Sequence, residues 1–430
     1  MDKKFYEDLE KDFNVIYPSN NSATYLSDMN YSLEYSTSYQ RWYRYKEGFS
    51  ISMVCRLIEK YNKYPDGIIL DPFMGSGSTL LAANSLGLPA VGFEINPFSF
   101  FLAKCKLTNY SQNDIKEFQN IISKFNAINF ESYQYILPML SFSGNVFDDD
   151  IEKYYMGIKS YIEQVDCSVN IKNLLKLGWL SNLENVSKYR KAGNGLKLKK
   201  YVKPRIITKQ DVLNDLLNVY NIMLEDLKNT SFTKDAKLIN DTCLNIKNYI
   251  DKNSISGIIF SPPYANCFDY TEIYKLELWF GDYVKDYIDL KSLRKKSLRS
   301  NLSSDLKNLH NFLTTDTLQI LLNDIANENL WDDKIPTMLK LYFSDMFNNI
   351  SDCYEVLKKD GFCCVVVGNS AYGGVVFPTD LIIAEFAKSI GFEVDCINIG
   401  RFIIPSSQQY NKTKELKNYL RESIICLKKK

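Results

Sequence analysis

Short apolar runs separated by amphipathic stretches dominate two parts of the chain, and this rhythm predicts an α/β fold. An apolar run at 67–70 is followed by a helical pattern that stops at Gly87 and by a second apolar run at 90–93. Similar runs return after residue 236. The runs expected to form strands are 67–70, 90–93, 237–240, 255–260, 362–367, 394–399 and 423–427. Helical patterns between such runs are typical of a doubly wound sheet with helices on both faces.

Two stretches interrupt this rhythm. From 107 to 235 the apolar spacing is helical, most clearly at 115–125 and 212–227, and the strand pattern stops. Residues 300–336 are polar and indicate a helical insertion or a mobile loop. The resulting division is an N-terminal arm at 1–50, a main α/β domain made of 51–106, 236–285 and 337–430, and insertions at 107–235 and 286–336.

The first strand–helix–strand unit carries a candidate ligand loop. Strand 67–70 runs into Asp71-Pro72-Phe73-Met74-Gly75-Ser76-Gly77-Ser78-Thr79, and the next strand ends at Glu94. Glycines let the backbone approach a ligand, and an acid at the tip of the second strand can bind ribose hydroxyls. The loop lacks the third glycine of a dinucleotide site, and Asp71 would repel phosphate but suits a cationic ligand with a free amino group. The pattern favours S-adenosylmethionine over a nicotinamide cofactor, with a purely structural turn as the alternative.

A second motif, Ser261-Pro262-Pro263-Tyr264, follows the apolar run at 255–260. Two consecutive prolines have no N–H groups, so the carbonyls around them project without neighbouring donors. Such a turn offers a hydroxyl, carbonyl acceptors and an aromatic face, which together suit a flat base that carries an exocyclic amino group. A Pro-Pro loop capped by a packed tyrosine is the structural alternative.

The amino-acid composition bears on metal binding and on the cellular location of the protein. The ten cysteines form no CxxC pair and His310 is the single histidine, so zinc-site spacing is absent and the cysteines are typical of reduced core residues. No signal peptide follows Met1, and no apolar run reaches the length of a membrane span. We therefore expect a cytoplasmic protein without a metal site.

The formal net charge is only +1, so contact with nucleic acid would need a local basic patch. One basic stretch runs from 188 to 205 around a Gly-Asn-Gly turn, and a second lies at 291–299. In an otherwise neutral chain these cations are candidates for phosphate contacts, with a solvated loop as the alternative. The candidate DNA-binding residues are Lys188, Arg190, Lys191, Lys197, Lys199, Lys200, Lys203, Arg205, Arg294, Lys295 and Lys296.

The glycine loop and the Ser-Pro-Pro-Tyr motif together resemble those of the DNA amino-methyltransferases, specifically the cytosine-N4 type. That family's loop is close to Asp-Pro-Phe-x-Gly-Ser-Gly-Thr-Thr, from which this chain departs only at Ser78. The similarity covers roughly 41–106, 236–285 and 337–430. It implies a Rossmann-like, seven-stranded methyltransferase sheet that uses S-adenosylmethionine to methylate double-stranded DNA. A cognate restriction endonuclease is an expected partner.

The resemblance also implies roles for individual residues. Ser261, Pro262, Pro263 and Tyr264 would be catalytic: Ser261 and the Pro262 carbonyl would hold the target amine while Tyr264 stacks on the extruded base. Phe49 and Ser50 would cover the cofactor, Glu94 would bind its ribose and Asp241 would lie near its adenine. The full implied cofactor set is Phe49, Ser50, Asp71, Pro72, Phe73, Gly75, Ser76, Gly77, Ser78, Thr79, Glu94, Asn96 and Asp241.

The order of the motifs carries further information. In the usual cytosine-N4 order the catalytic motif comes first, whereas here the cofactor loop precedes Ser261. The resemblance therefore implies an alternative arrangement in which 107–235 is the target-recognition region, with the basic stretch at 188–205 against the DNA.

Several alternatives remain open at this level. Adenine-N6 enzymes usually carry Asp or Asn at the position of Ser261, so serine favours cytosine. Methylation of cytosine carbon requires a nucleophilic thiol, commonly preceded by proline, and no cysteine here follows a proline. The other alternative functions are an RNA methyltransferase, a non-catalytic recognition subunit and a nicotinamide-dependent oxidoreductase.

Overall fold

The computed structural model describes residues 2–19, 36–46, 48, 50–137, 146–193, 195–199, 206–230, 234–307, 312–404 and 407–430. An eight-stranded sheet in the order β1-β11-β12-β8-β7-β2-β3-β6 forms its centre. The strands, in that order, are Val15–Ile16, Phe392–Phe402, Arg421–Lys429, Leu357–Gly368, Ile255–Phe260, Ile68–Asp71, Ala90–Phe93 and Ala236–Ile239. The strands from β8 to β6 run parallel, whereas β12 is antiparallel to both β8 and β11.

This sheet confirms the predicted α/β, Rossmann-like methyltransferase fold. All seven predicted strands are present, and parallel strands whose order reverses beside β2 bring the ends of β2, β3 and β7 to one edge. The eighth strand, β1, comes from the N-terminal arm and pairs in parallel with β11. Two residues are too few to show a strand pattern in sequence, so this pairing could not be predicted.

Helices cover both faces of the sheet, as the alternation of its side chains requires. Ile69 and Ile259 pack against α2 (Ile51–Tyr61) and α3 (Ser78–Ser85). The neighbouring Leu70 and Ile258 point to the opposite face and pack with α13 (Asp316–Ile325), α14 (Ile335–Val356) and α15 (Thr379–Ser389). The parallel strands are therefore buried on both sides.

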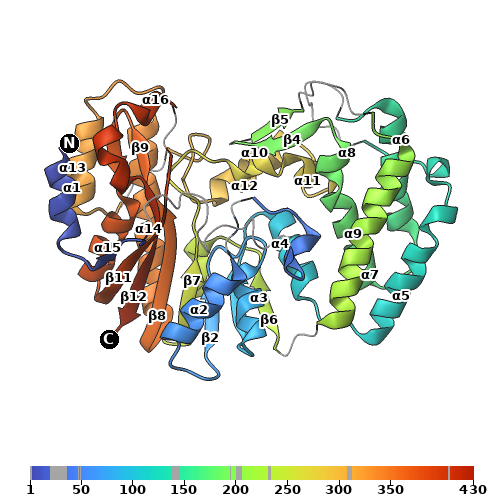
Figure 1. Cartoon of the computed structure of the whole chain (residues 1–430), viewed down its shortest axis with the longest axis horizontal. Helices are drawn as coiled ribbons and strands as arrows, with labels where there is room; N and C mark the ends of the chain where they lie inside the picture. Colours follow the sequence, from blue (N-terminus) through green and yellow to red (C-terminus); the bar gives the residue numbers. More distant parts are fainter. Residues whose placement is uncertain are drawn as a thin grey trace.

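The stretch 107–235 forms a largely helical lobe beside the sheet, at the right of Figure 1. Its helices are α5 (Gln112–Ser123), α6 (Asp149–Gln164), α7 (Val169–Ser181), α8 (Leu183–Val186) and α9 (Lys209–Asn229). The two helices predicted from apolar spacing are confirmed as α5 and α9. The lobe packs around Tyr155, Trp179 and Tyr220 and joins the sheet through α4 (Pro97–Leu107) in one continuous core.

The basic stretch that begins at Lys188, for which a solvated loop was the alternative, has regular structure in its described part. It forms a hairpin of β4 (Tyr189–Ala192) and β5 (Gly195–Leu198). Gly193 adopts a positive φ of 57°, which the tight connection requires. Figure 1 shows the hairpin at the top of the molecule, beside α10 (Tyr270–Ile273) and α12 (Tyr287–Lys296). Lys200, Lys203 and Arg205 lie outside the described residues.

The stretch 286–336 is more closely joined to the main domain than expected. It contributes α12, which follows α10 and α11 (Lys275–Phe280), and α13, whose Leu318, Leu321 and Ile325 share the core with α14. The N-terminal arm likewise packs on the C-terminal half, because α1 (Lys3–Glu10) places the Tyr6 hydroxyl 3.0 Å from the Val376 carbonyl it donates to. The remaining elements are β9 (Ser370–Tyr372), β10 (Val375–Phe377) and α16 (Ser407–Tyr410).

Over the described ranges, none of the helices combines the length and apolar character that crossing a membrane needs. All ten cysteines are free, and seven of them are buried, which agrees with the prediction of reduced core residues. Within the part of the chain that the structure describes, His, Cys, Asp and Glu side chains form no cluster of three or more able to hold a metal ion.

Candidate active site

The glycine loop connects the end of β2 to the start of α3 with two residues in the left-handed region. Gly75 has φ 49° and Gly77 has φ 86°, and Gly77 directly precedes α3. A side chain at Gly75 would lie 3.1 Å from the Tyr45 hydroxyl. Both glycines are therefore needed for the backbone path, and their lack of a side chain leaves the loop open to a ligand.

Glu94, at the end of β3, holds this loop through hydrogen bonds to backbone N–H groups. Its Oε2 accepts from the Gly75 N–H at 3.0 Å and its Oε1 from the Asn96 N–H at 2.7 Å. Burial raises the pKa of Glu94 to about 7. Asn96 caps α4 through its Oδ1, which accepts from the Phe98 and Ser99 N–H groups, while its buried Nδ2 has no hydrogen-bond partner among the described residues.

Asp71 lies fully buried behind the loop. Its Oδ1 accepts from the Phe73 N–H at 2.9 Å, whereas its Oδ2 is buried with no partner in the described part of the chain. Burial raises the pKa of this carboxyl to about 7. An acid whose folded pKa lies above its unfolded pKa binds extra protons in the folded state, so its ionisation destabilises the fold as the pH rises from about 4 to about 7.

Asp71→Asn should therefore change the pH dependence of stability. The free energy of unfolding of the variant, minus that of the natural protein, should increase by roughly 2–4 kcal/mol between pH 4 and pH 8. Urea unfolding of both proteins at the two pH values measures this gain. A difference between them that is the same at pH 4 and pH 8 would contradict the assignment of a buried, proton-binding carboxyl.

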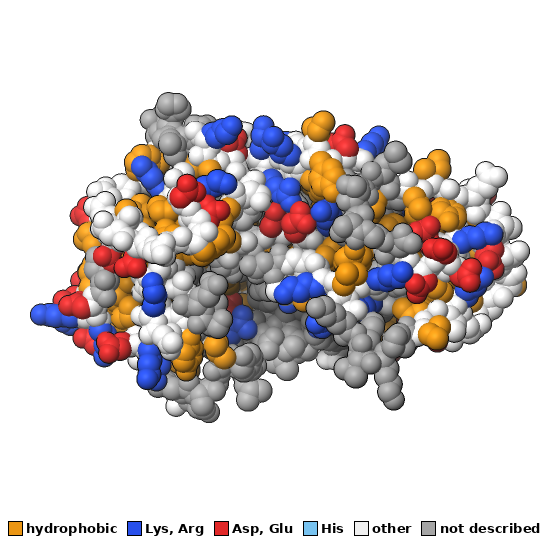
Figure 2. All heavy atoms as spheres, turned by 90° about the horizontal axis from the view of Figure 1, so that it is seen from above, with side chains coloured by type: hydrophobic (Ala, Val, Ile, Leu, Met, Phe, Trp, Pro, Cys, Tyr) orange, Lys and Arg blue, Asp and Glu red, His pale blue; other side chains and the backbone are white. Residues whose placement is uncertain are grey.

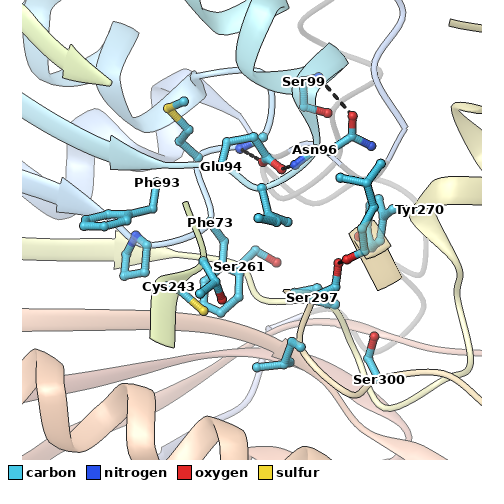
Figure 3. Close-up of a pocket in the computed structure, with 18 of the residues that line it drawn as sticks. Phe73, Phe93, Glu94, Asn96, Ser99, Cys243, Ser261, Tyr270, Ser297 and Ser300 are labelled. Carbon is cyan, nitrogen blue, oxygen red and sulfur yellow. Dashed lines mark hydrogen bonds between the residues drawn. The ribbon is translucent and has the colours of Figure 1, made fainter. Parts of the chain in front are cut away.

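One pocket of about 1080 Å³, its open mouth included, lies at this edge of the sheet. The cofactor candidates that line it are Pro72, Phe73, Gly75, Ser76, Ser78, Glu94, Asn96 and Asp241. Figure 3 shows Glu94 and Ser261 facing the cavity from opposite sides.

The remaining cofactor candidates lie behind the lining. Asp71, Gly77 and Thr79 shape the loop and the first turn of α3 without lining the pocket. Ser50 caps α2, as its position before that helix predicts, because its Oγ accepts from the Met53 N–H at 3.4 Å. Phe49 lies outside the described residues.

The catalytic candidates divide in the same way. Ser261 and Pro263 line the pocket, whereas Pro262 and Tyr264 do not. The Tyr264 hydroxyl donates to Glu422 Oε1 at 2.5 Å, and its ring lies so close to Gly368 that a side chain there would be 2.8 Å from two ring atoms. The stacking of Tyr264 on a base stays a prediction; in this structure its hydroxyl contacts β12 and its ring lies against β8.

Other pocket residues were missed by sequence reasoning. Tyr45, from the aromatic segment before α2, stacks on Tyr274 with ring centres 5.1 Å apart, and its hydroxyl lies 3.1 Å from Ser99 Oγ. Tyr270 faces the cavity from the side of Ser297, opposite Phe93 (Figure 3). The dense aromatics at 42–45 were the only signal for Tyr45, and that pattern usually marks a core.

The segment after α11 contributes a whole wall of the pocket. Its lining residues are Leu293, Arg294, Ser297, Leu298, Ser300 and Asn301. Arg294 donates to Asp269 at 2.8 Å and also pairs with Glu272. These bonds direct Arg294, one of the DNA-binding candidates, toward the pocket rim, whereas its neighbours Lys295 and Lys296 are exposed.

The cations of the hairpin also differ in their surroundings. Lys191 is buried and donates to Glu277 on α11 and to the Tyr43 hydroxyl. Lys199 donates to the carbonyls at the end of α8, and Lys188 pairs with Asp148 at 2.8 Å. Arg190 and Lys197, in contrast, are exposed. Figure 2 shows Lys and Arg side chains along the rim of a hollow near the middle of this face.

Comparison with known proteins agrees with this geometry. The family model described as DNA methylase, which represents N6 and N4 methyltransferases, matches residues 5–104. The chain is 29% identical over 385 residues to the Type II methyltransferase M.AvaI of a Nostoc species, covering 83% of this chain and 80% of that protein. It is 27% identical over 413 residues to the Type II methyltransferase M.BsoBI of Geobacillus stearothermophilus, covering 85% and 81%. These similarities support an S-adenosylmethionine-dependent DNA amino-methyltransferase.

The similarity to DNA methyltransferases supports S-adenosylmethionine as the cofactor, and the residues present fit that group. Glu94 retains lone pairs for hydroxyls, the buried Nδ2 of Asn96 lacks a partner beside the pocket, and Gly75 leaves space where a side chain would stand. Phe73 and Phe93 supply apolar walls next to Asp241. When bound, the cofactor supplies an electrophilic methyl group on a sulfonium centre.

Proposed function

We propose that this DNA methyltransferase modifies the exocyclic N4 amine of a cytosine that has been extruded from double-stranded DNA. The observation that carries the proposal is that a single pocket is lined both by the glycine loop with Glu94 and by Ser261. A methyl donor and an acceptor base can therefore meet without leaving the cavity. Serine at position 261 favours cytosine over adenine.

The chemistry depends on making a poor nucleophile reactive. The lone pair of an exocyclic amine is delocalised into the ring, so nitrogen attacks well only when it becomes pyramidal. Ser261 Oγ would accept one N–H bond of the amine, which favours that geometry and turns the lone pair toward the cofactor. The Pro262 carbonyl, expected to accept the second, belongs to a residue that does not line the pocket in this structure. The N–C bond would form as the methyl–sulfur bond of the donor breaks, with the thioether as leaving group and one N–H proton passing to water.

The pocket walls contribute orientation and exclusion of water. Pro263 and Tyr270 line the same pocket as Ser261, and the aromatic ring of Tyr270 is the pocket's candidate for stacking on the base. Base extrusion costs a few kcal/mol, and stacking in the pocket offsets part of that cost. A closed, apolar setting also strengthens the hydrogen bonds that hold the amine.

The proposal is tested by identifying the product. Duplex DNA is incubated with the protein and S-adenosylmethionine, digested to nucleosides and analysed by mass spectrometry against standards. N4-methylcytosine is the expected product. N6-methyladenine would move the assignment to the adenine class, methylation of RNA but not DNA would change the substrate, and no methylated nucleoside in either would overturn the proposal.

The exposed cations of the hairpin are proposed to contact the DNA backbone. Replacing Arg190 and Lys197 together by glutamine should weaken DNA binding and lower the salt slope, log K against log [salt], by up to about 2. Fluorescence anisotropy over a series of salt concentrations measures the slope. The control replaces two exposed cations of the helical lobe by glutamine. Lys116 lies on α5 and Lys124 directly follows it.

If the hairpin variant keeps the natural slope, or if the α5 control loses as much, the hairpin is not the contact. We further propose that 107–235 is the target-recognition region and that the protein acts beside a restriction endonuclease. The similarity to proteins named Type II methyltransferases supports the second point.

A further inference from the structure

A chain of hydrogen bonds leads from Ser261 away from the pocket and into the sheet. Ser261 Oγ donates to the Tyr264 hydroxyl at 3.3 Å, and the Tyr264 hydroxyl donates to Glu422 Oε1 at 2.5 Å. The other oxygen of Glu422 accepts from Arg401 Nε. We propose that Glu422 is a positioning residue that, through Tyr264, fixes Ser261 as a hydrogen-bond acceptor toward the target amine; this rests on the proposed function.

The carboxylate of Glu422 sets the direction of the chain, because a carboxylate can only accept hydrogen bonds. Glu422 stands near the start of β12, opposite Gly368 of β8 and Arg401 of β11, and is 5% exposed. In this buried setting it forms a salt bridge with Arg401. A hydroxyl beside an ionised carboxylate must point its proton at it.

The direction of the first bond sets the direction of the second. Since Tyr264 gives its proton to Glu422, its oxygen presents lone pairs to Ser261, and Ser261 in turn gives its proton to Tyr264. Burial and the neighbouring Glu422 raise the pKa of Tyr264 well above its ordinary value, so it remains a donor across the working pH range. The lone pairs of Ser261 Oγ are then left for the pocket.

This polarity is the one that the chemistry requires. An amine whose nitrogen is to attack must donate its N–H bonds and keep its lone pair free, so its partner must accept. A serine free to rotate could instead donate to the base and compete with the productive arrangement. The contact of Tyr264 with Gly368 holds the ring in place, which gives its hydroxyl one position between Ser261 and Glu422.

Glu422→Gln tests the inference, because an amide can donate to Tyr264 and reverse the chain. We expect kcat to fall about ten- to a hundredfold, with the KM for DNA and the affinity for S-adenosylhomocysteine changed less than about twofold. Tyr264→Phe should have a similar effect, and the Tyr264→Phe/Glu422→Gln double variant should lose no more than the worse single variant, because the residues act as one unit.

The decisive comparison adds Glu422→Gln to Ser261→Ala. If Glu422 acts through Ser261, the added substitution changes the residual rate less than about twofold. The inference would be overturned if Glu422→Gln lowered the rate of the Ser261→Ala variant by as large a factor as it lowers the rate of the natural protein. Additive losses in the Tyr264→Phe/Glu422→Gln double variant would overturn it too. Either result would show that Glu422 serves only the fold. A natural rate in Glu422→Gln would overturn it as well.

A matched control exists at the opposite end of the same two strands. Asp395 on β11 accepts from the Tyr61 hydroxyl at 2.8 Å and pairs with Lys428 on β12, so it repeats the tyrosine–carboxylate–cation arrangement away from the pocket. Asp395→Asn should leave kcat unchanged. If only the role of this hydrogen-bond chain is wrong, the natural protein still forms the methylated product. If the proposed function is wrong, the natural protein forms none, so the two failures are distinguishable.

Discussion

Ser261→Ala is expected to lower kcat by about 10²- to 10³-fold while DNA affinity stays within about threefold. The reason is that the hydroxyl contributes an acceptor that matters only when the amine is poised to react, so its loss affects the transition state more than binding. Single-turnover methylation and anisotropy on the same duplex measure the two quantities.

The control for Ser261→Ala is Ser297→Ala. Ser297 lines the same pocket, but its Oγ already donates to the Leu293 carbonyl at 2.9 Å. Its removal should change kcat less than about threefold. Equal losses of rate and affinity in Ser261→Ala would indicate a role in DNA binding or folding instead of catalysis.

Glu94→Ala should produce the largest loss of cofactor affinity, raising the Kd for S-adenosylhomocysteine by about 100-fold or more. The substitution removes a proposed acceptor for the cofactor and also leaves the Gly75 and Asn96 N–H groups without their carboxylate. Both losses act on the loop that shapes the pocket. Isothermal titration calorimetry measures the affinity directly.

Glu393→Ala serves as the control for this change. Glu393 lies on β11 in a surface ion pair with Lys430 and is remote from the pocket. Its loss should leave the Kd unchanged, because exposed ion pairs contribute little. A Glu94→Ala protein that is folded and binds the cofactor normally would remove Glu94 from the site.

The parts of the site that the sequence predicted are those set by local structure. A strand that ends in Asp71, a turn with Gly75 and Gly77, and a second strand that ends in Glu94 form one continuous unit, so their mutual position follows from the βαβ connection. The position of Ser261 followed from the same rule, because parallel neighbouring strands end at the same edge of the sheet.

The parts that were missed depend on contacts between distant segments. Arg294 has a basic surrounding sequence that suggests exposure, yet Asp269 and Glu272 bring it to the pocket. Lys191 was interpreted as a DNA contact, but Glu277, 86 residues away, buries its charge. Neither partner can be recognised from spacing along the chain.

Tyr264 illustrates the same limit within a recognised motif. Its identity follows from the motif, but its direction is decided by Glu422 and Gly368, which come from two other strands. The structure gives Glu422 a partner that the sequence could not reveal.

The cofactor held at the glycine loop is expected to face Ser261 across one cavity. A crystal structure of the protein with S-adenosylhomocysteine tests it most directly. We predict density for the ribose at Glu94 and for the sulfur on the side of the pocket that faces Ser261, with no residue between them. Ligand bound outside this pocket, or with its sulfur turned away from Ser261, would contradict the account.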